Sequence, residues 1–268
     1  MKNILKECFF KVRLLIYLIL GNIDNVFGRK CRVFTLCYHS ISSDNWRYSV
    51  SPESFKKQIS YLRKNFESIS GGKLYDYLKG NLKMDSPSFV LTFDDGYEDL
   101  LGIRTFIKKS KIKPILFLAS DVNKINRKSL DTSRRLLSTR QIKSFIKEGW
   151  NIGCHTSTHP EDLRKLSFID LINEIGKAKK SLEERLNTEI EYLSYPKGKY
   201  NKKVMEIVKN SGFKAAFSMD SGIVWKKSNI FALPREGVDR THTFAEFKSL
   251  FLPSVITFKK LVKIIVEK

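Results

Sequence analysis

The sequence predicts an α/β fold in which about seven parallel strands form a closed or nearly closed (β/α) barrel. Three observations lead to this prediction. Short apolar runs alternate with segments of helical periodicity between residues 33 and 233, and polar side chains able to do chemistry follow the runs directly. The 268-residue chain also has neither a GxGxxG nor a GxxxxGK motif, which would support the alternative, an open doubly wound sheet that binds a nucleotide.

The predicted strands are short apolar runs rich in β-branched and aromatic residues. Because helical segments separate them, we expect the strands to pair in parallel. The run NIGC at 151–154 is the weakest of the set. The full set is 33–38, 89–93, 115–119, 151–154, 190–195, 215–218 and 230–233.

The predicted helices have recognisable beginnings and ends. The segment 51–66 starts with Ser51 as N-cap and Pro52 at the first helical position, both favoured at helix starts. Three later segments have helical periodicity: 138–149, 167–187 and 201–212. Ser138 or Thr139 is the cap of the first, and glycines end two of them, Gly149 the first and Gly212 the last.

The chain is strongly basic. It has 49 Lys and Arg against 28 Asp and Glu, a formal charge of +21 and a pI near 9.8, which favours anionic partners. Nucleic acid is not predicted, because the basic stretch 104–113 lacks interleaved aromatic side chains for base stacking. It reads more simply as the solvated face of a helix. An anionic membrane surface is the expected partner of this charge.

Residues 1–31 form a basic apolar segment before a single predicted domain, 32–268. The block LLIYLIL is far shorter than the ~20 residues that span a bilayer, and no small-x-small cleavage pattern follows it. With Lys2, Lys6 and Lys11 around it, the segment predicts a helix lying in a membrane interface. A helix packed in the core is the alternative. The C-terminal stretch 254–268 has the same character.

Localisation follows from these termini and from the cysteines. The four cysteines show no CxxC pairing, so we expect free thiols in a reducing compartment. We therefore predict a peripheral protein at the cytoplasmic face of the cell membrane. An exported protein with an uncleaved N-terminal anchor is the alternative. The cysteines are Cys8, Cys31, Cys37 and Cys154.

Candidate functional side chains stand at or just after the ends of the predicted strands. In α/β barrels the carboxyl ends of the strands surround one ligand site. These scattered positions are therefore expected in a single pocket. They include His39, Asp94, Asp95, His155, Tyr195, Lys197 and Arg235.

Two histidines and two carboxylates predict a metal site. His155 and His159 are four residues apart and are half of the chain's 4 histidines, and this spacing lets both imidazoles face one point. One carboxylate of the Asp94–Asp95 pair would complete a two-His, one-carboxylate set that leaves positions open for water. A cation shared with Asp95 would offset the repulsion between the carboxylates and keep Asp94 ionised as a base.

The motifs LTFDDGYED (91–99) and GCHTSTHPEDLRKLS (153–167) resemble the first two motifs of the polysaccharide deacetylase family, the NodB-homology domain. LCYHSI (36–41) and LPREGV (233–238) are similar to flanking segments of its bacterial amino-sugar N-deacetylase branch. The resemblance covers residues from about 32 to 250. It implies a distorted, incomplete (β/α) barrel.

The same resemblance implies a metal-dependent hydrolase. Its expected reaction removes N-acetyl groups from an amino sugar of a cell-surface glycan or of its lipid-linked precursor. Asp94 would be the general base, and the metal ligands would be Asp95, His155 and His159. The expected cofactor is a divalent ion, with zinc the first choice.

The chain departs from the family in its third motif. Where the family has Arg-x-Pro-Tyr-Gly, this sequence has SYPKG (194–198), so Ser194 stands in place of the arginine. We expect Arg235 to orient Asp94 instead. The backbone N–H of Lys197 remains able to bind an oxyanion, because it does not depend on the side chain, and Tyr195 beside it is a candidate substrate contact.

The family's late Leu-x-His motif, which supplies a general acid, is not evident. His39, His242 or Asp94 itself would then protonate the leaving amine. Other functions on the same scaffold are an O-acetyl esterase or a deformylase, and a two-His, one-carboxylate iron oxygenase is formally possible. A non-catalytic glycan- or membrane-binding module is the alternative from another class, and the intact metal and base residues argue against it.

Overall fold

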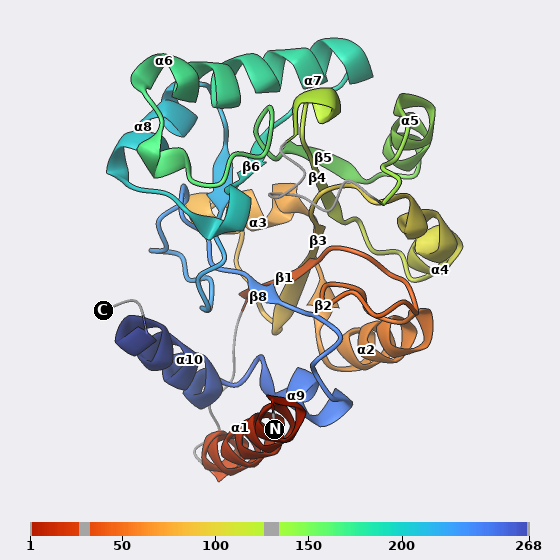
Figure 1. Cartoon of the computed structure of the whole chain (residues 1–268), viewed down its shortest axis with the longest axis vertical. Helices are drawn as coiled ribbons and strands as arrows, with labels where there is room; N and C mark the ends of the chain where they lie inside the picture. The colour runs from red at the N-terminus through yellow and green to blue at the C-terminus, as the bar shows by residue number, and fades with distance from the viewer. Residues whose placement is uncertain (1, 27–32, 126–133, 267–268) are drawn as a thin grey trace.

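The structure, a computed structural model, describes residues 2–26, 33–125 and 134–266. Its centre is a curled parallel sheet with strand order β7-β6-β5-β4-β3-β1-β8, and β2 pairs with β3 outside this path (Figure 1). The predicted distorted, incomplete (β/α) barrel is confirmed. The strands are β1 (Val33–Tyr38), β2 (Glu67–Ser68), β3 (Ser88–Phe93), β4 (Ile115–Leu118), β5 (Asn151–Cys154), β6 (Tyr192–Ser194), β7 (Ala215–Phe217) and β8 (Glu236–Gly237).

One predicted strand is wrong. Residues 230–233 form a turn, because the Asn229 side chain accepts a hydrogen bond from Phe231 N and its carbonyl accepts one from Ala232 N, a turn-forming use of asparagine. Leu233 makes a single bridge to Phe217. The strand begins later, as β8, and pairs with β1. The stretch from 233 to 237 therefore spans the gap between β7 and β1.

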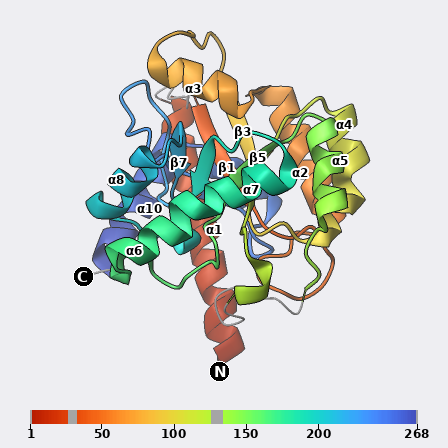
Figure 2. The same ribbon diagram turned by 90° about the horizontal axis from the view of Figure 1, so that it is seen from above.

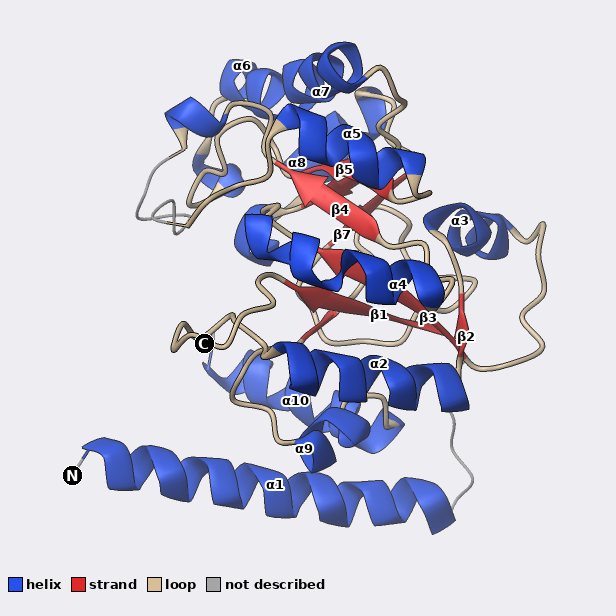
Figure 3. Ribbon diagram, turned by 90° about the vertical axis from the view of Figure 1, so that its right-hand side faces the viewer, coloured by secondary structure: helices blue, strands red, loops and turns tan. Residues whose placement is uncertain are grey.

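Helices cover the outside of the sheet, as Figures 2 and 3 show. Predicted caps are present: Ser51 accepts from Ser54 N, and Ser138 forms a capping box with Gln141. The predicted helix 167–187 is interrupted by a π-helical segment, Ile172–Lys177. The helices are α1 (Lys2–Val26), α2 (Pro52–Asn65), α3 (Gly71–Lys79), α4 (Arg104–Lys109), α5 (Thr139–Lys147), α6 (Phe168–Leu171), α7 (Ala178–Leu186), α8 (Lys202–Asn210), α9 (Phe244–Ser249) and α10 (Pro253–Val266).

The core has two main parts, because successive side chains of a strand point to opposite faces. Phe34 and Leu36 belong to the large cluster shared with the outer helices, whereas Val33 and Phe117 belong to a second cluster within the curl of the sheet. Leu74 of α3 joins this second cluster. Since α3 packs near the first residues of several strands, it leaves the opposite, carboxyl ends available for a site.

The N-terminal helix packs on the domain through the C-terminal helices α9 and α10 (Figure 3). Asp24 is buried and accepts hydrogen bonds from Ser254 N and Oγ, both at 2.8 Å, which caps the start of α10. Within the described residues, no helix is both long and apolar enough to cross a bilayer. Cys37 and Cys154 are buried free thiols; Cys31 and the side chain of Cys8 lie outside the described part.

Candidate active site

One cavity of about 440 Å³ lies at the carboxyl ends of the strands. His39 follows β1, Asp94 and Asp95 follow β3, and His155 follows β5. Parallel strands bring these positions together because their ends meet at one edge, as the sequence predicts. The cavity is lined by His39, Trp46, Tyr48, Asp94, Asp95, Tyr97, His155, His159, Lys197 and Met219.

The three predicted metal ligands converge in this cavity. Asp95 Oδ1 is 3.6 Å from His155 Nε2 and 3.9 Å from His159 Nε2, and all three residues are buried. Two ligand atoms about 2.1 Å from one ion at a tetrahedral angle are about 3.4 Å apart. Among the described residues, none donates a hydrogen bond to the buried Asp95 Oδ1. A buried carboxylate oxygen without a donor, facing two imidazole nitrogens, fits a divalent cation.

The lowered histidine pKa values agree with a ligand set, whereas Asp95 would need the charge of a bound cation to be ionised. Burial raises the pKa of Asp95 well above its usual range, and the neighbouring Asp94 charge raises it further. Burial lowers the pKa of His155 and takes that of His159 to about 2, with His155 adding to the effect. Both histidines are thus neutral at pH 7, the form that binds metal.

The backbone at the site is strained. Asp95, Thr156, His159 and Lys197 all have left-handed φ values, of 70°, 67°, 52° and 55°. Such conformations cost roughly 1–3 kcal/mol each for residues other than glycine and cluster at functional sites. Gly96 follows Asp95 at φ 75°, and a Cβ at this position would collide with the Leu118 side chain. The turn after β3 therefore requires this glycine.

Arg235 forms a bidentate ion pair with Asp94. Its Nη1 and Nη2 donate to Asp94 Oδ1 and Oδ2, each at 2.7 Å, and both residues are almost fully buried. Burial alone would raise the pKa of Asp94, but the Arg235 guanidinium outweighs it and holds this pKa below its usual range. Asp94 is therefore an ionised carboxylate in a largely dry setting.

Ser194, which stands in place of the family arginine, contributes to the same cluster. It accepts from Arg235 Nη2 at 2.7 Å and donates to Asp94 Oδ2 at 3.2 Å. The main chain of Ser194 also contacts a predicted metal ligand, because its carbonyl oxygen lies 2.8 Å from His155 Nδ1. Nδ1–H donation to this carbonyl leaves Nε2 of His155 as the free acceptor that faces Asp95.

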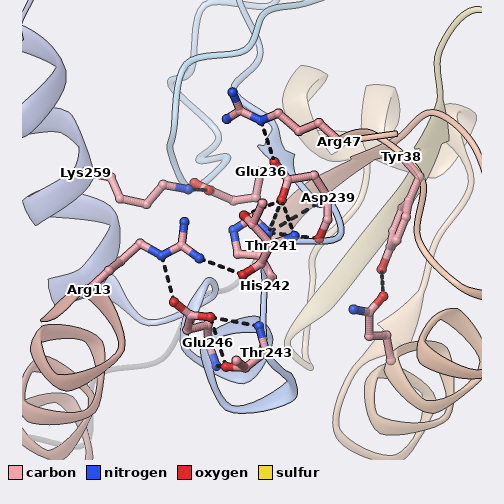
Figure 4. Close-up of polar contacts among 11 residues, drawn as sticks. Arg13, Tyr38, Arg47, Glu236, Asp239, Thr241, His242, Thr243, Glu246 and Lys259 are labelled. Carbon is pink, nitrogen blue, oxygen red and sulfur yellow. Dashed lines mark hydrogen bonds and ion pairs between the residues drawn. The ribbon is translucent and has the colours of Figure 1, made fainter. Parts of the chain in front are cut away.

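The structure separates the two histidines among the candidate general acids. His39 lines the cavity, and one of its ring nitrogens lies within 4.8 Å of an Asp94 oxygen. Burial lowers the pKa of His39 to about 4. His242 instead pairs with Asp239 at 3.2 Å (Figure 4), and it lines a different, polar cavity. Of these two histidines, only His39 shares a cavity with Asp94.

The two candidate residues of the third motif, Lys197 and Tyr195, also lie in different places. Lys197 lines the cavity, its ammonium pairs with Glu161, and its backbone N–H donates to no other described residue. Tyr195 is buried away from the cavity lining: its hydroxyl donates to Phe231 O at 2.8 Å, and its ring stacks on Tyr200. The structure thus brings Lys197, but not Tyr195, to the site.

An aromatic wall of the cavity was not anticipated from the sequence. Trp46 makes edge contacts with Tyr48 and Tyr97, and the Arg134 guanidinium lies over the Trp46 ring at 4.4 Å. Tyr48 is 40% exposed, so part of this wall faces solvent. Trp46 and Tyr48 come from the loop after β1, where no periodic pattern marks them. Exposed aromatic rings beside a polar site suit the apolar faces of sugar rings.

Comparisons with known proteins give the same family. The sequence profile described as polysaccharide deacetylase matches residues 81–216. A poly-β-1,6-N-acetyl-D-glucosamine N-deacetylase of Staphylococcus aureus (strain MSSA476) is 27% identical over 208 residues, which is 74% of this chain and 70% of that protein.

Two solved structures share the fold. Streptococcus pyogenes deacetylase PplD, in complex with acetate, superposes with a TM-score of 0.72 at 21% identity and covers 84% of this chain and 100% of its own. IcaB from Ammonifex degensii gives 0.70 at 23% identity, covering 87% and 98%.

Proposed function

This chain belongs to the polysaccharide deacetylase family, and from that premise we propose that it removes N-acetyl groups from an amino sugar of a cell-surface glycan or its lipid-linked precursor. As a carbohydrate deacetylase it is a hydrolase of C–N bonds. The observation that carries the proposal is the Asp94–Arg235 ion pair beside the cluster of Asp95, His155 and His159. The kinship to the S. aureus poly-N-acetylglucosamine deacetylase supports a polymer of that class.

A divalent cation, with zinc the first choice, would be held by Asp95, His155 and His159. When bound, such an ion polarises an acyl carbonyl and lowers the pKa of water from ~16 toward ~7. The donor set of two imidazoles and one carboxylate is typical of hydrolytic zinc sites.

The protein groups around this site have distinct tasks. Asp94 removes a proton from the attacking water, and Arg235 keeps the Asp94 carboxylate ionised and fixed in orientation. The Lys197 N–H donates to the oxyanion that develops on the acetyl group. Trp46 and Tyr48 pack against the sugar ring that carries this group.

His39 protonates the leaving amine. Because its pKa of about 4 leaves it neutral at pH 7, its proton must come from the reaction itself, from the attacking water by way of Asp94. A ring nitrogen within 4.8 Å of an Asp94 oxygen allows this transfer after small movements. The proton then passes to the nitrogen as its bond to the acetyl carbon breaks.

The direct test is acetate release from poly-β-1,6-N-acetylglucosamine and from N-acetylglucosamine oligomers. We expect release by protein reconstituted with zinc, none after treatment with a chelator, and recovery when metal is restored. Acetate release from an O-acetylated polymer but not from the N-acetylated one would instead support an esterase. No release from either substrate by metal-loaded protein would contradict the proposal.

The assignment of the general acid has a matched control within the chain. We expect His39→Gln to lower kcat about 10²-fold with a smaller change in KM, because general acid catalysis contributes about 10²–10⁴-fold. His242→Gln should leave kcat within about twofold, since His242 lies in the separate cavity with Asp239. Steady-state kinetics of both variants decides the assignment, and equal losses would exclude His39 as the acid.

We further propose that the protein works at an anionic membrane surface, which it contacts through α1. One side of α1 packs against the domain. Arg13 donates to Glu246 at 2.7 Å and to Thr241 O at 2.9 Å (Figure 4), and Tyr17 is buried. With 3.6 residues per turn, the opposite side presents the exposed apolar face. It consists of Val12, Leu15, Leu18 and Ile19, from 45% to 59% exposed.

The surroundings of this apolar face favour a lipid surface over a protein partner. Lys11 at its start is exposed, and the chain carries a formal charge of +21. Apolar side chains with basic neighbours are typical of interfacial helices. Because α1 runs roughly antiparallel to β1, with the two axes aligned (Figure 3), the catalytic cavity would open along the membrane, where a surface glycan is accessible.

Vesicle co-sedimentation tests the membrane contact. The wild-type protein should bind vesicles containing phosphatidylglycerol, bind less at high salt, and bind little to pure phosphatidylcholine. Val12→Ser, Leu15→Ser and Ile19→Ser combined should abolish binding. The matched control changes three apolar residues exposed elsewhere, Phe168, Ile169 and Ile172, to serine and should bind normally. Dimerisation through α1 in solution, without vesicle binding, would reject the proposal.

A further inference from the structure

The loop that carries both histidine ligands is held in place by one carboxylate. Glu174 Oε2 accepts from Ser157 N at 3.0 Å and from Thr158 N at 2.9 Å, and its Oε1 accepts from Thr158 Oγ1 at 2.7 Å. All of these donors lie between His155 and His159. Among the described contacts, no other side chain makes three hydrogen bonds to residues 156–158.

Glu174 lies in the π-helical segment Ile172–Lys177. A π-turn adds a residue to the helical turn, and such insertions are frequent at functional sites. It changes the direction in which the following side chains leave the helix axis. The segment between α6 and α7 therefore departs from a regular α-helix at Glu174, the residue whose carboxylate contacts the loop 156–158.

The loop needs this support because its conformation is strained. Thr156 and His159 have φ values of 67° and 52°. Residues other than glycine keep such a left-handed conformation only when surrounding contacts hold it. Thr156 Oγ1 accepts from His159 N at 3.1 Å. On the other side, Ser120 N and Asp121 N donate to the Thr156 and Ser157 carbonyls at 3.1 and 2.9 Å. Glu174 satisfies the two amides that would otherwise be free to turn away.

We propose that Glu174 is a positioning residue: it fixes the loop so that Nε2 of His155 and of His159 face Asp95 at metal-binding distance. The inference rests on the proposed metal centre. Its action is indirect, because Glu174 bonds to the residues between the ligands and not to the ligands themselves. Groups that hydrogen-bond directly to metal ligands change metal affinity by about 10–100-fold when they are removed, and we expect the loss of this loop support to act on the same scale.

The test measures metal affinity by competition with a chromogenic chelator, together with the visible spectrum of the cobalt-substituted protein. We expect Glu174→Ala to weaken zinc and cobalt binding 10–100-fold and to alter the cobalt spectrum. Glu174→Gln should stay within a few-fold of wild type. Its amide oxygen can still accept from the two backbone amides, and its amino group can donate to the Thr158 hydroxyl.

Glu183 provides the control. It lies on α7, and its carboxylate accepts from Ile190 N at 3.1 Å and from Lys179 Nζ at 2.7 Å, so it also ties a helix to a loop, but to the loop before β6 and not to residues 156–158. Glu183→Ala should lower the melting temperature without changing metal affinity. If Glu174→Ala behaves in the same way, the positioning role is wrong. If the wild-type protein binds no metal, the proposed metal centre itself fails, which is a different result.

Discussion

Asp94→Asn is expected to reduce acetate release by about 10³-fold or more at saturating metal and substrate. The amide cannot take a proton from water, and general base catalysis contributes about 10²–10⁴-fold. The loss should appear in kcat, with KM nearly unchanged, because the substitution preserves the size of the side chain. Metal binding should persist, since Asp95, His155 and His159 remain in place.

Asp99→Asn is the matched control for this prediction. Asp99 is a partly buried carboxylate in the same segment, and it accepts from Ser40 Oγ at 2.6 Å and from Ile41 N at 3.0 Å. It does not line the catalytic cavity. Its amide variant should keep most of the activity, although some stability is lost with the charged acceptor. An Asp94→Asn protein as active as Asp99→Asn would show that another group is the base.

Arg235→Met is expected to cause the largest loss of stability, about 3–5 kcal/mol in the free energy of unfolding. The change leaves the buried Asp94 carboxylate without its bidentate partner, and an uncompensated buried charge costs about this much. It also removes donors to Ser218 O and Thr92 Oγ1. Denaturant unfolding of the metal-free protein measures the effect. Activity should fall too, because the carboxylate loses its fixed orientation.

The double variant Arg235→Met with Asp94→Asn separates charge from packing. With the charge of Asp94 removed, we expect the double variant to be more stable than Arg235→Met alone.

The pH dependence of the stability has a defined sign. In the wild type the pKa of Asp94 lies below its unfolded value, so ionised Asp94 stabilises the protein above that unfolded value, near pH 4. Without Arg235, burial raises this pKa, and the stability difference between the two proteins should shrink as the pH falls toward 4. A difference that does not change with pH would contradict this account of the ion pair.

Much of the fold follows from local patterns in the sequence. β1, β5 and α2 lie where the apolar runs and caps predict them, to within about a residue. The segment at 230–233 is the exception, because its apolar composition resembles a strand while the Asn229 side chain folds it into a turn. Composition does not reveal such a local hydrogen bond. The π-helical segment around Glu174 was likewise not predicted, since the sequence keeps helical periodicity throughout 167–187.

The sequence by itself predicts the kind of site: two adjacent carboxylates, a His-x-x-x-His spacing and their places at strand ends indicate a hydrolytic metal site, because parallel strands deliver their carboxyl ends to one edge. Only the tertiary structure decided how Asp94 is held. The small Ser194 leaves room beside this carboxylate. Arg235, the residue just before β8 and 41 positions later in the chain, occupies it. The same holds for which histidine, His39 and not His242, shares a cavity with Asp94. Spacing along the sequence does not predict which side chain contacts Asp94, because that depends on distances between segments that only the packed barrel sets.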